Sequence, residues 1–342
     1  MASADAPVAP LKAQNGHTTP SEAHHGLDLR NAGLPLDLAW ARAQRVNPSA
    51  TRRRAATLGT RRSVKKEWQA AWLLRAIACM DLTTLAGDDT PGRVQRLCAK
   101  ARQPLRPDLV EALGMGDHGL TTGAVCVYHA FVPEAVEALA GTDLPVAAVS
   151  TGFPHGLSPL KERLREIEAS VAAGAREIDV VIQRGMVLRG AWDQLYEEVQ
   201  AMRAACGDAH LKVILGTGEL GPLWNVAAAS RVCMMAGADF IKTSTGKESV
   251  NATLEVGLTM VRAIRDYEAH AGYRIGFKPA GGIRTAKEAL TWLILMKEEL
   301  GAPWLSPNLF RFGASSLLAD IERQLSHHIT GRYAARHHMP MA

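Results

Sequence analysis

Beyond about residue 120, short apolar and β-branched runs alternate with longer amphipathic stretches. The runs have the length of strands and are apolar throughout, which is typical of a parallel sheet covered on both faces. Seven such strands are predicted at 124–128, 146–150, 177–182, 211–215, 240–243, 275–278 and 310–314, and an eighth is expected at 304–306. Because no G-x-G-x-x-G turn follows an early strand, this α/β pattern fits a (β/α)8 TIM barrel better than a doubly wound sheet.

The N-terminal third has a different pattern. Residues 1–30 are rich in Ala, Pro, His and Ser without apolar periodicity, so we expect residues 1–60 to form a poorly ordered extension. Helical spacing begins near Val64, and a second helix is predicted at 90–101 with Thr90 as its N-cap. The resulting division is an extension at 1–60, helices packing on the barrel at 61–120, the barrel at 121–330 and a tail at 331–342.

The charge of the chain is concentrated in one stretch. The net charge is +5, and residues 51–66 hold seven basic residues and no acid. This basic arm is expected to be a solvated segment ahead of the first helix, with an electrostatic contact to RNA, a membrane or a partner as the alternative. No nucleic acid or membrane partner is required by the rest of the sequence.

Composition indicates a soluble protein from a reducing compartment. Hydrophobic residues make up 47% of the chain, yet no run approaches the ~20 apolar residues of a membrane helix. Five cysteines without C-x-x-C spacing argue against a disulfide framework and against a zinc site. The N-terminus lacks the apolar region of a secretory signal, so we expect a cytoplasmic location.

Charged residues interrupt four of the predicted strands. Asp179, Lys212, Lys242 and Lys278 each stand in an otherwise apolar run. Burying a charge costs several kcal/mol unless it is paired, so four such residues predict a use for them, although any one alone could reach solvent at a strand end. In a barrel the carboxyl ends of the strands converge on one mouth, and these residues would meet there.

Covalent chemistry on a carbonyl is the use that these residue types favour. A free amine attacks an aldehyde, whereas an ordinary lysine of pKa ~10.4 is almost entirely ammonium at neutral pH. Lys242 is the candidate nucleophile, and Lys278 the second cation that lowers its pKa by repulsion. Asp179 is the candidate proton shuttle.

Three glycine-rich turns follow late strands and precede helices. They are Thr243–Lys247, Ala280–Thr285 and Gly313–Ser316. Free backbone amides at helix starts bind anions, and barrels often hold a phosphate in the loops after their last strands. The turns therefore predict a phosphorylated aldehyde or sugar as substrate.

Five motifs together resemble the deoxyribose-phosphate aldolase family, in particular its longer, animal-type members. They are Phe-Ile-Lys-Thr-Ser-Thr-Gly-Lys at 240–247, Gly-Phe-Lys-Pro-Ala-Gly-Gly-Ile-Arg-Thr at 276–285, Glu-Ile-Asp-Val-Val at 177–181, Met-Asp-Leu-Thr-Thr-Leu at 80–85 and Phe-Gly-Ala-Ser-Ser at 312–316. The resemblance implies a class I aldolase of deoxyribose phosphate catabolism. It would cleave 2-deoxy-D-ribose 5-phosphate to D-glyceraldehyde 3-phosphate and acetaldehyde, without metal or cofactor.

The resemblance also implies roles for individual residues. Lys242 matches the Schiff-base lysine, Lys278 the lysine that perturbs it and Asp179 the proton-relay aspartate. The residues that match the phosphate-binding turns are Gly246, Lys247, Gly281, Gly282, Ser315 and Ser316. Those that match the substrate pocket are Asp81, Cys126, Lys212 and Thr245, although from the residues alone Cys126 is expected to be a packed thiol.

Two positions depart from the family pattern, and two other functions stay open. Gly216 stands where many bacterial members have an acid, so the support of that acid for the lysines is either absent or moved to Glu219. Tyr333 is the nearest counterpart of a C-terminal tyrosine that some members use in proton transfer. The alternatives are another lysine-dependent sugar-phosphate aldolase of the transaldolase kind, and a binding or scaffold protein that uses the basic arm. A homo-oligomer is compatible with either enzyme.

Overall fold

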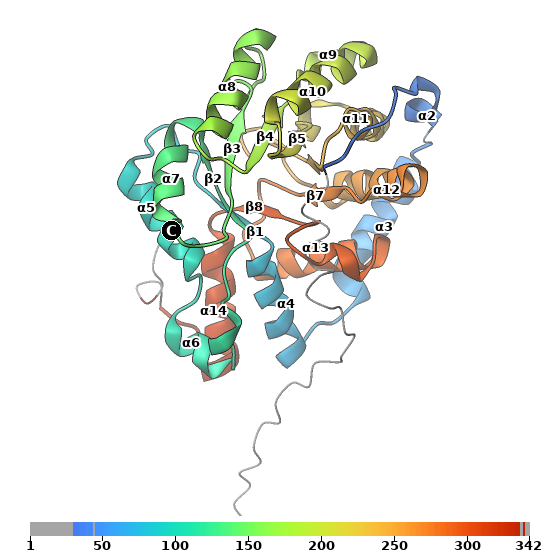
Figure 1. Ribbon diagram of the computed structural model, residues 1–342. Coiled ribbons are helices and arrows are strands. Elements are labelled where there is room, and N and C mark those ends of the chain that lie inside the picture. The colour runs from blue at the N-terminus through green and yellow to red at the C-terminus, as the bar shows by residue number, and fades with distance from the viewer. Residues whose placement is uncertain (1–29, 44, 336–337, 339–342) are drawn as a thin grey trace, which may run out of the picture.

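Eight parallel strands close into a barrel, and the helices surround it (Figure 1). The computed structural model describes residues 30–43, 45–335 and 338. Neighbouring strands pair in the order β7-β6-β5-β4-β3-β2-β1-β8, and parallel bridges from Phe277 to Phe310 and from Ala280 to Gly313 close the ring. The strands are β1 (Met80–Thr83), β2 (Ala124–Tyr128), β3 (Val146–Ser150), β4 (Glu177–Val181), β5 (His210–Ile214), β6 (Phe240–Lys242), β7 (Gly276–Lys278) and β8 (Phe312–Ala314). The predicted TIM barrel is confirmed.

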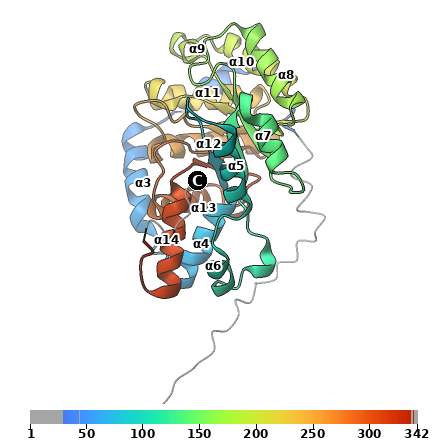
Figure 2. The same ribbon diagram turned by 90° about the vertical axis from the view of Figure 1, so that its left-hand side faces the viewer.

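Helices connect consecutive strands and cover the outside of the barrel, as the side view also shows (Figure 2). The α-helices are α2 (Leu38–Ala43), α3 (Pro48–Arg61), α4 (Lys66–Ala78), α5 (Pro91–Arg102), α6 (Pro107–Ala112), α7 (Val132–Ala138), α8 (Leu160–Ala172), α9 (Arg184–Arg189), α10 (Trp192–Cys206), α11 (Leu223–Met235), α12 (Leu254–Ala271), α13 (Ala286–Glu299) and α14 (Leu317–Thr330). Short 3-10 turns are η1 (Gly116–His118), η2 (His129–Phe131), η3 (Thr217–Glu219) and η4 (Ala302–Trp304). Over the described part of the chain, no helix is long and apolar enough to cross a membrane.

Local sequence signals explain where two of these helices begin. Thr90 caps α5 by accepting a hydrogen bond from the Arg93 amide, and Pro91 occupies the first helical position, as predicted. Thr285 and Glu288 form a reciprocal capping box at the start of α13. Both caps hold a helix start at the carboxyl end of a strand, where the predicted mouth lies.

The strands present different side chains to the two sides of the barrel wall. Along β4, Ile178 and Val180 belong to the apolar layer beneath the helices. Because strand side chains alternate, Glu177 and Asp179 face the interior instead. On the neighbouring strands β3 and β2 the interior is lined by a small apolar group, Cys126, Ala147 and Val149. The interior is therefore divided into a charged side and an apolar side.

Two predictions about the barrel's boundaries were wrong. The eighth strand is β1 at Met80–Thr83, whereas the segment from Trp304 lies in and after the 3-10 turn η4. The barrel therefore begins at residue 80, within the range that was assigned to separate packing helices. β1 was missed because it follows α4 after a single intervening residue, so its apolar positions continue the apparent helical pattern.

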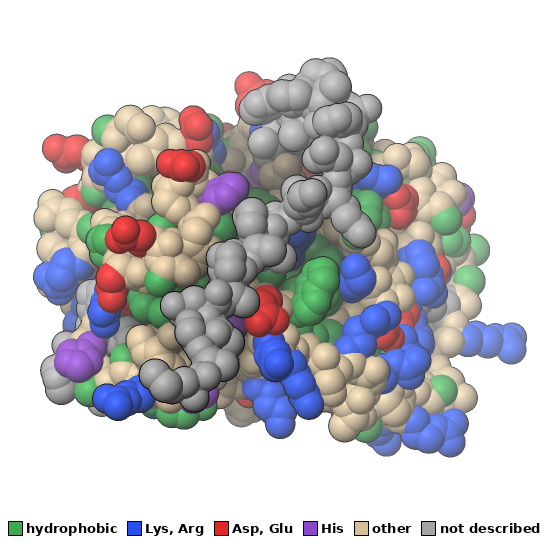
Figure 3. All heavy atoms as spheres, turned by 90° about the horizontal axis from the view of Figure 1, so that it is seen from below, with side chains coloured by type: hydrophobic (Ala, Val, Ile, Leu, Met, Phe, Trp, Pro, Cys, Tyr) green, Lys and Arg blue, Asp and Glu red, His purple; other side chains and the backbone are tan. Residues whose placement is uncertain are grey.

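The basic stretch is also more ordered than expected. Residues 1–29 lie outside the described residues, but α2 and α3 pack against the barrel's outer helices, α2 on α11 and α3 on α12 and α13. Arg54, Arg61 and Arg62 all pair with Glu298, at 2.9, 3.0 and 2.9 Å. Seen from below, Lys and Arg side chains are frequent on the side where α3 lies (Figure 3).

Candidate active site

Lys242, Asp179 and Lys278 meet inside the barrel, each from a different strand. Lys242 ends β6, Lys278 ends β7, and the two are register partners. Both amines donate to the same carboxylate oxygen, Asp179 Oδ2, at 2.8 Å from Lys242 and 2.7 Å from Lys278. All three side chains are buried. The structure thus brings together the three residues that were predicted to carry the chemistry.

The surroundings of the two lysines shift their pKa values in opposite directions. Burial and the neighbouring Lys278 ammonium lower the pKa of Lys242 below its ordinary value. Burial also disfavours a charged Lys278, but Asp179 and Asp81 outweigh it and raise the pKa of Lys278. Burial likewise opposes ionisation of Asp179, yet the surrounding lysines hold its pKa below the usual range. Of the two lysines, Lys242 is therefore the one whose ammonium loses its proton more easily.

Seven ionisable side chains form an interior charge cluster around this centre. Its members are Asp81, Glu177, Asp179, Lys212, Lys242, Lys278 and Arg311. Without Lys242, three carboxylates face three cations and the cluster is neutral. A protonated Lys242 would be a surplus positive charge in a region of low dielectric, where an unbalanced charge is costly. The composition of the cluster thus favours the neutral amine.

Lys242 lines a cavity of about 520 Å³ at the carboxyl ends of the strands. The other lining residues come from the ends of β1 and β8, from the segments that follow β1, β6, β7 and β8, and from α5. They include every residue predicted to bind phosphate: Gly246, Lys247, Gly281, Gly282, Ser315 and Ser316. Thr245 lines the same cavity. Lys242 and the glycine-rich turns therefore share one mouth.

The turns of this cavity differ in their free hydrogen-bond donors. Within the described residues, the backbone amides of Gly281, Gly282, Ser315 and Ser316 donate no hydrogen bond. The turn after β6 is different, because the Glu248 carboxylate accepts from the amides of Thr245 and Gly246 at 3.0–3.2 Å. An anion would find its amide donors in the turns after β7 and β8, with the exposed Lys247 ammonium beside them.

Comparison with known proteins identifies the family. The model of the DeoC/LacD family aldolases matches residues 75–323, which span the whole barrel. The chain belongs to the DeoC/LacD aldolase family. It is 63% identical to the deoxyribose-phosphate aldolase of Mus musculus over 312 residues, which cover 91% of this chain and 98% of the relative. It is 60% identical to that of Homo sapiens over 318 residues, which cover 92% and 100%.

A solved structure of an aldolase of this family has the same fold. The deoxyribose phosphate aldolase of Aeropyrum pernix matches with a TM-score of 0.58 and 22% identity, over 82% of this chain and 99% of that chain. The Aeropyrum pernix protein is a tetramer. At this level of identity the likeness concerns the fold alone.

Three residues predicted for the substrate pocket of this aldolase lie below the cavity. Asp81 and Lys212 are fully buried members of the interior charge cluster, and Lys212 contacts Asp179 Oδ1 at 3.2 Å. Cys126 is fully buried beside the lysines, and burial raises the pKa of its thiol. Cys126 therefore packs as a neutral thiol, which agrees with the reading from the residues alone.

Two members of the cluster escaped the sequence analysis. Glu177 accepts from Lys212 at 2.5 Å and from Arg311 at 2.8 Å. Both residues stand at the amino-terminal ends of their strands, where a charge normally reaches water. The available signal for Glu177 was its position two residues before Asp179. Residues with this spacing face the same side of a strand, so both carboxylates would point into the barrel.

The two departures from the family pattern have local explanations. Gly216 has φ +66°, and a Cβ there would meet the Arg184 side chain. Arg184 Nε donates to Glu219 at 2.7 Å, so Glu219 is engaged outside the lysine cluster and does not replace the missing acid. Tyr333 stacks on His327 near the end of α14, whereas Ser316 precedes the start of that helix. Tyr333 is thus remote from the mouth.

Proposed function

We propose that this aldolase cleaves 2-deoxy-D-ribose 5-phosphate to D-glyceraldehyde 3-phosphate and acetaldehyde through a Schiff base on Lys242. The observation that carries the proposal is a buried lysine with a lowered pKa that opens onto a cavity with unpaired backbone amides. The amine accounts for attack on an aldehyde, and the amides for a phosphate at the other end of the same substrate.

Lys242 acts as nucleophile and electron sink. Its neutral nitrogen attacks the aldehyde carbon, and loss of water gives a protonated imine. The substrate's 3-hydroxyl then passes its proton to Asp179, and the bond between carbons 2 and 3 breaks. The electron pair of that bond flows into the imine to form an enamine, and D-glyceraldehyde 3-phosphate is released. Protonation at carbon 2 and hydrolysis release acetaldehyde and return the free amine.

Asp179 and Lys278 take part in the proton transfers of this reaction. The Asp179 carboxylate contacts both amines and can accept a proton or pass one on, and Lys278 holds the carboxylate in place as an ammonium. Below them, Asp81 and Lys212 fix Lys278 and Asp179 through further ion pairs. Thr245 lines the cavity beside Lys242, and Cys126 packs beneath the lysines.

The phosphate is held by the turns after β7 and β8. The amides of Gly281, Gly282, Ser315 and Ser316 supply donors, and Lys247 supplies charge at the rim. The Gly246 amide is bonded to Glu248 and is not available to the phosphate. Gly246 instead forms the turn that places Lys247 at the rim. Binding at this remote group orients the aldehyde toward Lys242.

Borohydride trapping with the deoxy sugar phosphate tests the substrate, the mechanism and the residue together. Reduction during turnover should fix a covalent adduct on Lys242, located by peptide mass spectrometry. Lys242→Met should give no adduct and no cleavage, while Lys247→Met, a lysine of the same mouth, should still be trapped. Cleavage that persists in Lys242→Met would overturn the proposal. Release of acetaldehyde separates this reaction from that of a transaldolase-like enzyme.

A cytoplasmic location and a homo-oligomeric state complete the proposal. All five cysteines are free and buried, and burial raises the pKa of Cys98 to about 11 and of Cys206 to about 12. Such thiols suit a reducing compartment. Cell fractionation tests the location, and light scattering on the purified protein tests the oligomeric state.

A further inference from the structure

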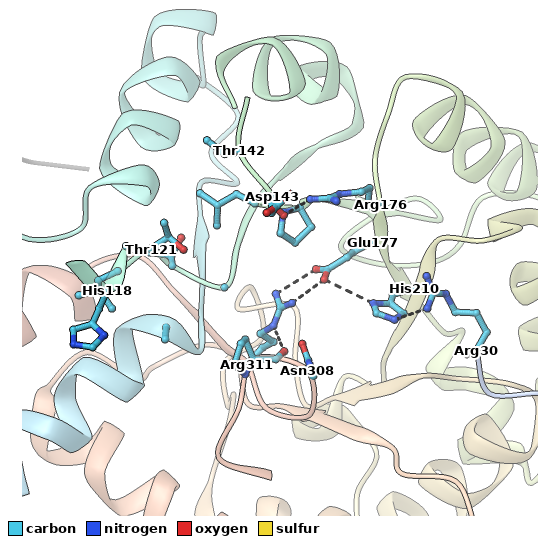
Figure 4. A pocket seen from close by; sticks show the side chains of 18 residues that line it. Arg30, His118, Thr121, Thr142, Asp143, Arg176, Glu177, His210, Asn308 and Arg311 are labelled. Carbon is cyan, nitrogen blue, oxygen red and sulfur yellow. Dashed lines mark hydrogen bonds and ion pairs between the residues drawn. The ribbon is translucent and has the colours of Figure 1, made fainter. Parts of the chain in front are cut away.

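A second cavity, of about 740 Å³, opens at the amino-terminal ends of the strands, opposite the mouth (Figure 4). Glu177 lies in its wall between Arg311 and His210, and Arg30 lies beyond His210. Arg311 and Glu177 are buried and paired at 2.8 Å. Neither residue lines the cavity that holds Lys242, so neither is placed to touch substrate.

Two lines of contact nevertheless join this ion pair to the reacting amine. Glu177 accepts from Lys212, and Lys212 donates to Asp179, the carboxylate that binds Lys242. On the other side Arg311 donates to Asp81 at 2.5 Å, and Asp81 accepts from Lys278. Each member of the pair thus reaches the active centre through one intermediate of opposite charge.

A role in packing alone does not explain why this ion pair is present. Replacing a buried ion pair with apolar residues is often neutral or stabilising, so its presence is weak evidence for a role in stability. Here, moreover, the pair supplies one carboxylate and one cation to a cluster whose balance leaves Lys242 as the surplus charge. Removing either member would change that balance, and the two removals would do so in opposite directions.

We propose that Glu177 and Arg311 are a positioning pair, which holds Lys212 and Asp81 in place and in which each member cancels the charge of the other, so that the balance that keeps Lys242 a neutral amine is preserved. The inference rests on the proposed role of Lys242 as the Schiff-base lysine. It assigns a part in the reaction to the end of the barrel that the substrate does not reach.

The two single substitutions have opposite expected effects. Cleavage requires the neutral amine, so the acidic limb of the kcat/KM profile follows the pKa of Lys242. Glu177→Gln removes a negative charge, makes protonation of Lys242 harder and moves the limb to lower pH. Arg311→Gln removes a positive charge and moves the limb to higher pH. Removal of a unit charge at this distance from Lys242 is expected to move the limb by about one pH unit.

Other titratable groups face these residues and need controls. Asp179, Lys278 and Cys126 surround Lys242, and Lys212 and His210 face Glu177, with the His210 Nδ1 at 3.9 Å. Cys79 and Asp81 face Arg311, and burial raises the pKa of Cys79 to about 12, beyond the range of the profile. His210→Asn should retain the acidic limb; its disappearance there would assign the limb to His210 and overturn the proposal.

The decisive experiment compares pH profiles of the full-length parent, both single variants and Glu177→Gln/Arg311→Gln. The double variant restores the balance and should return the limb to the parent position, which general damage to the fold would not do. Glu198→Gln breaks a buried ion pair outside the barrel and should leave the limb unmoved. Limbs that move in the same direction, or a double variant that keeps a single variant's shift, would refute the pair's role.

Two further readouts keep the outcome clear. If Arg311→Gln does not fold, Arg311→Lys, which keeps the charge, should retain the parent limb, and Glu177→Gln is then compared with the double variant. Borohydride trapping of the parent separates this inference from the proposed function. An adduct on Lys242 with unmoved limbs refutes the positioning pair alone, whereas absence of an adduct refutes the Schiff-base role itself.

Discussion

Arg163 and Glu198 form an ion pair between α8 and α10, and Lys242 and Asp179 form another inside the barrel. Both pairs are buried to a similar extent: the side chains are 0% and 4% exposed in the first pair, and 3% and 0% in the second. They differ in their partners. The Glu198 carboxylate has one cation, which binds it through two contacts of 2.7 and 2.5 Å, whereas Asp179 contacts three lysines.

This difference separates a structural pair from a reactive one. Arginine keeps its charge in proteins, and its planar fork matches one carboxylate, so Arg163 and Glu198 neutralise each other completely. A lysine can lose its proton when it is buried among other cations. Inside the barrel each carboxylate is shared, and the amine with the least compensation is the one exposed to the cavity. Reactivity therefore depends on sharing as well as on burial.

Lys278→Leu should produce the largest effect, because it removes the cation that competes with Lys242 for Asp179. Burial still lowers the pKa of Lys242, but Asp179, now without Lys278, raises it. More of the amine is then protonated at neutral pH, and turnover should fall by roughly 10³-fold. The acidic limb of the pH–rate profile should move to higher pH, so part of the rate returns as pH increases. A profile identical to that of the parent would contradict this account.

Glu198→Gln should show the opposite combination, a large loss of stability without a change in chemistry. The substitution leaves the Arg163 guanidinium buried without its counter-charge, which costs about 3–5 kcal/mol of the free energy of unfolding. Urea unfolding at neutral pH measures this loss. Arg163→Met/Glu198→Met should recover most of it, because both charges are then absent. A displaced acidic limb in Glu198→Gln would show that the two ion-pair systems are coupled.

The sequence pointed to the three residues of the proposed chemistry because each one violates a local pattern. Lys242, Lys278 and Asp179 interrupt apolar strands, and strands of that type in a βα repeat predict a barrel whose carboxyl ends meet. The residue alternation within one strand is a property of the backbone, so these inferences need no long-range information. The barrel and the three central residues were therefore predictable.

The residues that escaped prediction depend on closure of the barrel. Glu177 and Arg311 are charges at strand starts, where a charge normally reaches water, and they meet only when β8 comes to lie beside β1. The packing of residues 48–61 on α13 has a similar cause, since Glu298, a partner of Arg54, lies 244 residues away, whereas the start of this helix has local signals in the Asn47 cap and Pro48. The local periodicity of the sequence does not predict such contacts.

Lys247→Met should have the smallest effect and extends the comparison to an exposed lysine. Lys247 lies at the rim of the cavity, where its amine donates to the Leu85 carbonyl oxygen at 2.8 Å. Water solvates this charge, so its removal should leave the interior charge cluster and the pKa of Lys242 unchanged. We expect KM for the phosphorylated sugar to rise about tenfold with kcat retained, because a charge-assisted contact to phosphate is lost. Cleavage of unphosphorylated 2-deoxyribose should be unaffected, and Lys287→Met, an exposed lysine on α13 away from the cavity, should change neither reaction. An equal loss with both sugars would place Lys247 in the chemistry, and the distinction between a buried lysine that reacts and an exposed one that binds would then fail.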